Sequence, residues 1–356
     1  MGEKVWKNYR LAINGLVHDV KYNQRTIDML FLPFLRRLTS LQQRAKRRIL
    51  VYLVAPPGTG KTTLSLLLEK LSAAREGLTP IQAIGLDGFH YHSDYIRTHS
   101  VERDGKLIPM IDVKGCPETF DVVHLREKLW SLKKEDIRWP VYDRRYHDVV
   151  EDVKLLNHDI ILLEGNWLLL REGAWQDIRS FADYTLFISA KAEDLRERLI
   201  GRKMRGGKTR QEAEHFYETS DKLNVEHILK FSWLAEETWK MLPDGDYFLQ
   251  ADAPKPLHRV NREALWRKLD VRRSEDDIMM ESIQRQLAAY HATGQGLDSY
   301  MKGYAEGVDV AKKEILQVLY NSGRMSSKEI LDLFHLESEE LADILLDERR
   351  VLDKNV

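Results

Sequence analysis

Short, continuous apolar runs alternate with helical patterns through the middle of the chain. The predicted strands are residues 49–54, 81–86, 160–164 and 184–189, with 247–249 as a weaker candidate. Continuous apolar runs of this length are typical of strands buried on both faces, as in a parallel sheet covered by helices. Residues 62–75 and 192–200 carry helical patterns between these runs. The pattern therefore predicts an α/β fold with a doubly wound, mainly parallel sheet.

The two ends of the chain show other patterns. Residues 9–22 form two short alternating runs around Asn14-Gly15, and a helical apolar stretch covers residues 29–41. Asn-Gly between alternating runs favours the type I′ turn of a β-hairpin. No strand pattern follows residue 258, where several helical stretches are expected. We expect three parts: a hairpin and helix extension (1–47), a middle α/β domain (48–258) and an all-α C-terminal region (259–356).

Composition and charge exclude several classes of protein. The 356 residues include 55 Lys and Arg against 56 Asp and Glu, which argues against a chain-wide nucleic-acid footprint. No uncharged run reaches the roughly 18 residues that a membrane span needs. The N-terminus lacks the apolar segment of a secretion signal, and one cysteine, Cys116, fits a reducing compartment. We expect a cytoplasmic protein that binds neither membrane nor nucleic acid.

The sharpest motif follows the first predicted strand. It is Ala55-Pro56-Pro57-Gly58-Thr59-Gly60-Lys61-Thr62, which matches the P-loop pattern G-x-x-x-x-G-K-[ST] except for Ala at the first Gly position. In such a loop, backbone N–H groups surround the β-phosphate, Lys61 reaches the β- and γ-phosphates, and the Thr62 hydroxyl ligates Mg²⁺. The N-terminus of the following helix adds to anion binding. The motif predicts a P-loop NTPase fold that binds ATP or GTP with Mg²⁺ through residues 55–62 and Thr63.

Two carboxylate residues lie at the carboxyl ends of predicted strands. Asp87 comes after the run at 81–86, and Glu164 ends the run at 160–164. Ligands of open α/β sheets bind at the carboxyl ends of strands, so both side chains are expected near the γ-phosphate. Asp87 is a candidate base for an incoming hydroxyl, and the alternative is an ordinary Asp-Gly turn. Glu164 has the position of a Walker B carboxylate that holds Mg²⁺, and the alternative is a strand-end ion pair.

A basic segment surrounds two adjacent glycines, Gly206 and Gly207. Its cations are Arg202, Lys203, Arg205, Lys208 and Arg210. We interpret it as a mobile lid whose arginines neutralise charge on the transferring phosphoryl group. A solvated helix end and a short RNA-contact patch are the alternatives.

Taken together, these motifs resemble the phosphoribulokinase, uridine kinase and pantothenate kinase family of P-loop small-molecule kinases, in particular its bacterial nucleoside or nucleotide kinase-like members. The segments that carry the resemblance are the loop at 55–62, Asp87-Gly-Phe-His90, residues 115–121, 140–143 and 163–166, and the lid segment with Arg198, Asp221 and Asn224. Residues 140–148 and 114–121 lack strand or helix periodicity and are expected to be loops, either binding loops or ordinary surface loops.

The resemblance implies ATP-dependent phosphorylation of an alcohol on a small metabolite by a kinase domain at 48–258. The acceptor would be a nucleoside, a sugar or a pantothenate-like alcohol. The implied catalytic residues are Asp87 as the base, Lys61, Arg202 and Arg205, with Thr62 and Glu164 at the metal. The implied acceptor residues are His90, Tyr142, Arg144, Arg145, Asn166 and Asn224.

The C-terminal region leaves rival hypotheses open. Residues 326–348 begin like a small helix-turn-helix element, but they carry eight acidic residues and one basic residue, Lys328. Because a phosphate backbone would repel that charge, we favour a helical packing or dimerisation element over DNA binding. A regulatory P-loop ATPase that switches a protein partner through these helices is the alternative function.

Overall fold

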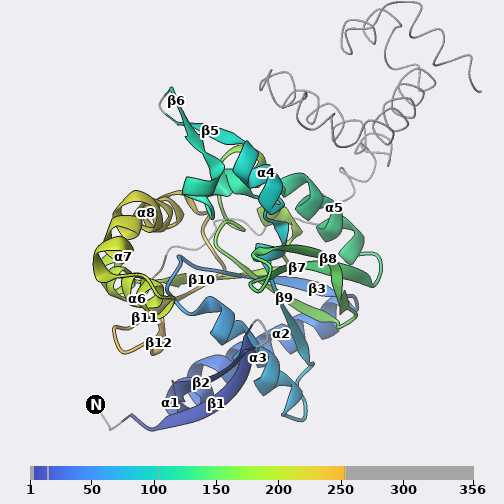
Figure 1. Ribbon diagram of the computed structural model, residues 1–356. Helices are drawn as coiled ribbons and strands as arrows, with labels where there is room; N and C mark the ends of the chain where they lie inside the picture. The colour runs from blue at the N-terminus through green and yellow to red at the C-terminus, as the bar shows by residue number, and fades with distance from the viewer. Residues whose placement is uncertain (1–3, 14–15, 104, 252, 254–356) are drawn as a thin grey trace, which may run out of the picture. The chain divides into compact units, whose positions relative to one another are not determined.

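A six-stranded sheet organises the part of the chain that the structure describes. The structure is a computed structural model that describes residues 4–13, 16–103, 105–251 and 253 (Figure 1). The strand order is β12-β11-β10-β3-β9-β4. The strands are β3 (Ile49–Val54), β4 (Ile81–Gly85), β9 (Ile160–Gly165), β10 (Tyr184–Ser189), β11 (Glu237–Met241) and β12 (Tyr247–Leu249). All neighbours pair in parallel except β11 and β12, so the predicted mainly parallel α/β fold is confirmed.

One strand of this sheet was not predicted from the sequence. In β11 buried and half-buried residues alternate, so it lacks the continuous apolar run that marks β3 and β9. The weaker candidate at 247–249 is confirmed as β12, which pairs antiparallel with β11 at the edge of the sheet.

Each face of the sheet is covered by its own hydrophobic cluster. Ile49, Val51 and Leu53 of β3 belong to one cluster, and the residues between them belong to the other. Because all six side chains of β3 are buried, its sequence is apolar throughout. The larger helices are α2 (Leu32–Ala45), α3 (Lys61–Ala73), α5 (Val122–Leu132), α6 (Ala192–Arg205) and α8 (Lys222–Phe231). Residues of α2, α3 and α6 join the first cluster, and residues of α5 join the second.

The N-terminal hairpin packs on α3. Strands β1 (Trp6–Ile13) and β2 (Leu16–Asn23) pair antiparallel in a register that leaves two residues for the turn, as predicted. A short helix α1 (Gln24–Thr26) and a π-helical turn (Ile27–Phe31) lead into α2. Side chains of β1, β2 and the π-helical turn share the first hydrophobic cluster with Leu64, Leu67 and Leu68 of α3. The division of the chain at residue 47 stays a prediction.

Two further hairpins lie outside the sheet. They are β5 (Ser100–Arg103) with β6 (Lys106–Pro109), and β7 (Ile137–Asp143) with β8 (Asp148–Leu156). The loop predicted at 140–148 is therefore wrong at both ends, since only residues 144–147 connect the two strands. Strand periodicity is lost there because the register shifts between Trp139 and Val141, on either side of Pro140.

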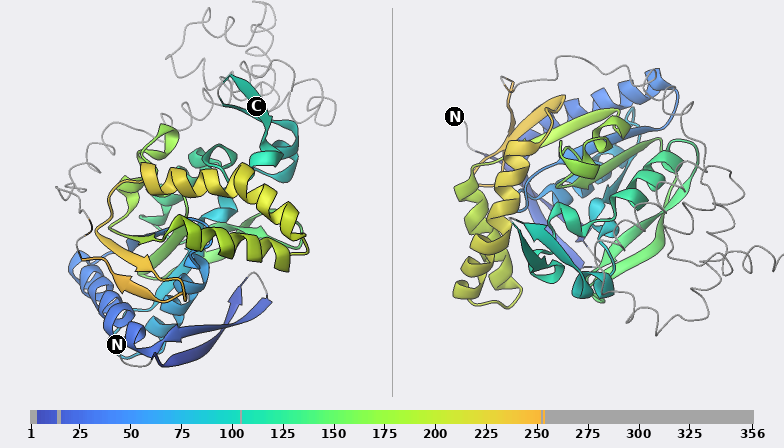
Figure 2. Two further views of the ribbon diagram at one scale, coloured as in Figure 1. Left: turned by 90° about the vertical axis from the view of Figure 1, so that its left-hand side faces the viewer. Right: turned by 90° about the horizontal axis from the view of Figure 1, so that it is seen from above.

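Helices α6 and α8 lie side by side on one flank of the sheet (Figure 2). The remaining short helices are α4 (Ser93–Thr98) and α7 (Arg210–Phe216). Among the residues that can be placed, no helix is long and apolar enough to cross a bilayer. The helices predicted beyond residue 258, and the hypotheses attached to them, lie outside the described residues.

Candidate active site

The P-loop connects β3 to α3, and both of its glycines have a conformation that favours glycine. Gly58 and Gly60 have φ angles of 87° and 82°. A Cβ atom on Gly58 would also lie 3.1 Å from Cγ of Leu199 on α6. Ala55, at the first Gly position of the motif, is fully buried at the end of β3.

Three consecutive carbonyl groups of the loop accept hydrogen bonds from other elements or from α3. Arg198 Nε donates to Gly58 O at 2.7 Å, and Tyr247 Oη donates to Thr59 O at 2.8 Å. Thr63 Oγ1 donates to Gly60 O at 2.7 Å. In a trans peptide the carbonyl and the next N–H point in opposite directions, and none of the described peptide bonds is cis. The N–H groups of residues 59–61 therefore point away from these partners, as a phosphate cradle requires.

Thr62 and Glu164 are in direct contact at the carboxyl edge of the sheet. The Thr62 hydroxyl donates to Glu164 Oε1 at 2.7 Å, and Glu164 is paired in register with Leu53 of β3. Burial raises the pKa of Glu164, while the neighbouring Lys61 ammonium lowers it and the Asp87 carboxylate raises it further. Because burial and the Asp87 charge disfavour the ionised form of Glu164, a bound cation would stabilise this carboxylate.

Asp87 lies at the same edge. It is exposed in a short 3₁₀ turn, Leu86–Phe89, that directly follows β4. Gly85, two residues earlier, is paired in register with Glu164. The structure thus brings Asp87 and Glu164 together beside the P-loop, and their catalytic roles stay predictions.

Two glycines hold the turn that carries Asp87. A Cβ atom on Gly88 would lie 2.2 Å from the carbonyl oxygen of Pro140 in β7, and one on Gly165 would lie 2.7 Å from Cβ of Leu86. Neither position has room for a side chain. The close packing of both glycines was missed from the sequence, where the available signal was that each directly follows a candidate carboxylate.

Two predicted acceptor residues, His90 and Tyr142, lie close to one another. The His90 ring stacks on Phe120 with centroids 3.9 Å apart and meets Tyr142 edge-on at 5.9 Å. The Tyr142 hydroxyl accepts a hydrogen bond from Lys114 Nζ at 2.9 Å. Burial lowers the pKa of His90, although the neighbouring Asp87 carboxylate opposes this effect. A neutral imidazole, which can both donate and accept hydrogen bonds, is therefore favoured.

Asn166 and Arg144 add polar groups near the carboxylates. Asn166 directly follows Gly165, and its buried Oδ1 atom has no hydrogen-bond partner among the described residues. Arg144 is exposed and lies close enough to Glu164 to lower the pKa of that carboxyl. Both side chains are available to a bound acceptor.

Among the described residues, no hydrogen bond or ion pair links the other two predicted acceptor residues, Arg145 and Asn224, to these carboxylates. Arg145 pairs with Asp143 at 2.6 Å, and 79% of its side chain is exposed. Asn224 is half-buried on α8, and its side chain makes no hydrogen bond within the described part of the chain. Their proposed contact with an acceptor gains no support from the arrangement of these side chains.

The predicted lid begins on α6. That helix ends at Arg205, Gly207 has a φ angle of 96°, and α7 begins with a capping box at Thr209. Burial raises the pKa of Asp221, and the nearby Arg202 guanidinium lowers it. Arg202 thus lies beside Asp221 and Arg205 is exposed at the helix end, whereas Arg198, one turn earlier than Arg202, contacts the P-loop.

The residues at this edge suit Mg²⁺ that arrives with a nucleotide. Within the described ranges, no group of three or more His, Cys, Asp or Glu side chains could hold a metal ion. Thr62 and Glu164 nevertheless offer a hydroxyl and a carboxylate side by side. Mg²⁺ usually takes one or two protein ligands and completes its shell with water and substrate phosphates, so this pair fits it.

Comparison with known proteins identifies the family. No family model matches the chain. It is 42% identical over 238 residues to "Uncharacterized protein YggC" of Escherichia coli K12, across 67% of this chain and 97% of that protein. It is 28% identical over 280 residues to a pantothenate kinase of Myxococcus xanthus, across 67% of this chain and 83% of that enzyme. A solved structure from Silicibacter sp. TM1040, called a "putative fructose transport system kinase", has a TM-score of 0.50 and 26% identity, across 58% of this chain and 98% of that one.

The fold and the site define a P-loop small-molecule kinase. The chain belongs to the phosphoribulokinase, uridine kinase and pantothenate kinase family, as its motifs had indicated.

Proposed function

We propose that the protein transfers the γ-phosphoryl group of ATP to a hydroxyl group of a small metabolite, namely a nucleoside, a sugar or a pantothenate-like alcohol. The observation that carries the proposal is the position of Asp87 beside the hydrogen-bonded pair of Thr62 and Glu164. A nucleotide-dependent switch needs the P-loop and a metal site, but it does not need a second, exposed carboxylate to accept a proton from an alcohol.

Each group of residues at the site has its own role in phosphoryl transfer. The P-loop N–H groups and Lys61 hold the phosphates, and Arg202 and Arg205 of the lid would neutralise charge on the phosphoryl group. Thr62 and Glu164 would hold Mg²⁺, which when bound neutralises phosphate charge. Asp87 accepts the proton of the attacking hydroxyl, the step typical of a general base in kinases.

The acceptor site offers both flat and polar surfaces. The rings of His90, which stacks on the buried Phe120, and of Tyr142 can pack on the carbon skeleton of a small molecule, while Asn166 Oδ1 can accept a hydrogen bond from one of its hydroxyl groups. The Myxococcus relative is named for pantothenate and the Silicibacter protein for fructose transport. These names support an alcohol as the acceptor, and they do not distinguish between a sugar and a pantothenate-like alcohol.

A panel assay tests the proposal. ADP release from Mg²⁺-ATP is measured with nucleosides, sugars, pantothenate-like alcohols and glycerate, with Lys61→Ala as the blank. We expect one compound to raise ADP release above the blank and to gain the mass of one phosphate. If wild-type protein binds and slowly hydrolyses ATP but no compound stimulates it, the proposal is overturned in favour of a regulatory ATPase.

A cytoplasmic location completes the proposal. Cys116, the one cysteine of the chain, is buried and unpaired. An unpaired thiol fits a reducing compartment, where ATP and phosphate acceptors are also found.

A further inference from the structure

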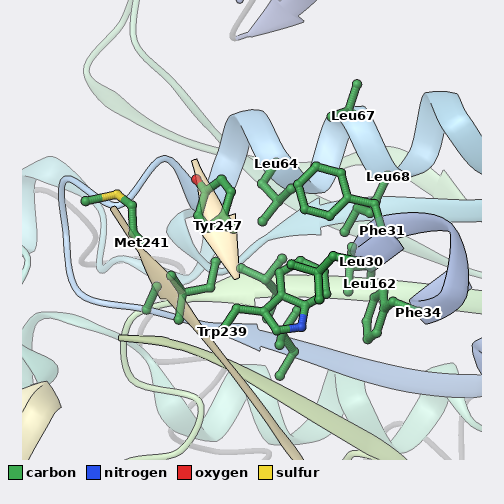
Figure 3. Packing of buried hydrophobic residues seen from close by; sticks show 14 of the residues in the cluster. Leu30, Phe31, Phe34, Leu64, Leu67, Leu68, Leu162, Trp239, Met241 and Tyr247 are labelled. Carbon is green, nitrogen blue, oxygen red and sulfur yellow. The ribbon is translucent and has the colours of Figure 1, made fainter. Parts of the chain in front are cut away.

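The P-loop is held by a residue far outside its own motif. Tyr247 begins β12, and its hydroxyl donates to the Thr59 carbonyl at 2.8 Å. The side chain is only 5% exposed, and its ring belongs to the hydrophobic cluster that Figure 3 shows with Phe31 and Leu64. A Cβ atom on Gly60 would lie 3.3 Å from the same hydroxyl. The Tyr247 hydroxyl therefore lies against the peptide that joins Thr59 to Gly60.

This hydrogen bond orients the Gly60 N–H. Burial raises the pKa of Tyr247 far above its ordinary value, so the hydroxyl stays protonated and can donate. With the Thr59 carbonyl bound to Tyr247, the N–H of the same peptide points to the opposite side. If this peptide rotated, a carbonyl oxygen would replace an N–H donor beside the phosphates. The bond therefore favours the phosphate-binding form of the loop.

The residue before Tyr247 is bound to the N-terminal extension. Asp246 is 5% exposed, and its carboxylate accepts hydrogen bonds from Asn23 Nδ2 at 2.8 Å and Thr26 Oγ1 at 2.7 Å. The same carboxylate pairs with Lys4 at 3.0 Å and accepts the backbone N–H of Tyr247 at 2.9 Å. The start of β12 is thus held in place by side chains from the hairpin end and α1.

A second contact joins the extension to the loop. The Tyr22 side chain, which is 6% exposed, lies beside the side chain of Thr63. Thr63 Oγ1 in turn donates to the Gly60 carbonyl at 2.7 Å. The extension therefore reaches Thr59 through Asp246 and Tyr247, and it reaches Gly60 through Thr63.

We propose that Tyr247 is a positioning residue for the nucleotide loop, and that Asp246 with Asn23 and Thr26 makes the N-terminal extension part of the nucleotide site. The proposal rests on the nucleotide-binding part of the proposed function and is independent of the acceptor. It gives the extension a role in binding phosphates in addition to its share of the hydrophobic core.

The first test compares two Tyr→Phe variants of the full chain. Tyr247→Phe removes only the hydroxyl that binds Thr59. Tyr184→Phe is the matched control, because it removes a half-buried hydroxyl that donates to Glu237 Oε2 at 2.9 Å in the same sheet. Calorimetry measures the Kd for Mg²⁺-ATP, and thermal unfolding without nucleotide reports stability. We expect Tyr247→Phe to weaken ATP binding about three- to tenfold, the usual worth of one hydrogen bond, and Tyr184→Phe to leave the Kd unchanged. Equal Kd values in both variants would overturn the positioning role.

The second test asks whether the extension acts through Tyr247. Thr26→Val removes the hydroxyl that binds Asp246 and keeps the shape of the side chain. We expect it to weaken ATP binding about two- to threefold in wild-type protein and to add nothing in the Tyr247→Phe background, because residues of one network do not act additively. No effect in wild type, or the same effect in both backgrounds, would overturn the role of the extension. If wild-type protein binds ATP but phosphorylates no acceptor, the proposed function fails while this inference stands.

Discussion

Gly165 lies so close to Leu86 that a Cβ atom added to it would approach Leu86 Cβ to 2.7 Å. The contact matters because Gly165 directly follows Glu164 and Leu86 directly precedes Asp87. The two carboxylates of the candidate site are thus held at their spacing by packing between their chain neighbours. Because Leu86 Cβ is attached directly to the backbone, it cannot turn away from a methyl group added at Gly165, so such a group overpacks the contact.

Gly165→Ala should therefore separate the carboxylates. We expect the free energy of unfolding to fall by about 1–3 kcal/mol, the usual cost of overpacking, and kcat to fall more than the KM for ATP rises. Gly201→Ala is the matched control, because among the residues that the structure describes the added Cβ would meet Arg205 Nη1 alone, at an ordinary 3.5 Å within α6. That control should gain up to about 1 kcal/mol from helix propensity. A Gly165→Ala enzyme with wild-type kcat would show that the spacing does not depend on this contact.

Asp87→Asn tests the base directly. It keeps the shape of the side chain but cannot accept the proton of the acceptor hydroxyl, so turnover should fall by about 10²–10⁴-fold. The Kd for Mg²⁺-ATP should change little. Asp94→Asn is the control, since the Asp94 side chain is 99% exposed. Steady-state rates with the identified acceptor and calorimetry with ATP separate the two effects, and unchanged turnover in Asp87→Asn would exclude the base assignment.

Lys61→Ala tests the phosphate loop. Removal of the ammonium group should weaken Mg²⁺-ATP binding by tenfold or more and abolish transfer, because a charge-assisted contact to phosphate is worth roughly twice a neutral one. Lys70→Ala on the same helix is the control, because within the described residues its ammonium donates to the Arg10 carbonyl alone, at 3.3 Å. If both variants bind ATP equally well, Lys61 does not contact the phosphates.

The parts of the fold and site that could be predicted are those with a local signal. The apolar run of β3, the P-loop motif and the carboxylates after β4 and β9 each occupy a few adjacent residues. The meeting of these carboxylates at one edge then follows from the ordinary behaviour of α/β proteins, in which the carboxyl ends of parallel strands lie at the same edge of the sheet.

The contacts that were missed join residues far apart in the chain. Tyr247 and Thr59 are 188 residues apart in the sequence. Gly88 and Pro140, which lie close together in the fold, are separated in the sequence by the whole of α5. Nothing near Tyr247 in the sequence marks it as a partner of the P-loop, because its hydroxyl meets the loop only after the sheet has formed. β11 was missed for a related reason, since its alternating burial lacks the continuous apolar run used to find the other strands.

The Asp246 network predicts a pH dependence of stability whose sign can be worked out. Burial alone would raise the pKa of Asp246, but the hydrogen bonds from Asn23, Thr26, Lys4 and the Tyr247 N–H together lower it below its ordinary value. A carboxyl group with a lower pKa in the folded state stabilises the fold fully above its unfolded pKa of about 3.9, and this stabilisation is lost as the pH falls through the folded value. Asp244 and Lys4 also face this carboxylate, and Lys4 keeps its positive charge throughout the acidic range.

Denaturant unfolding at pH 6, 4 and 3, with wild type and Asp246→Asn compared at each pH, measures this contribution. Asp246→Asn removes the titrating carboxylate and retains one of its two oxygen acceptors. We expect the variant to be the less stable protein at pH 6 and the difference to shrink as the pH falls, because wild type alone loses the Asp246 charge. Asp244→Asn is the control, because Asp244 is about half-exposed and binds Lys4 at the surface. The difference in unfolding free energy between this variant and wild type should change much less with pH. A constant difference between wild type and Asp246→Asn from pH 6 to pH 3 would mean that this carboxylate does not titrate with folding.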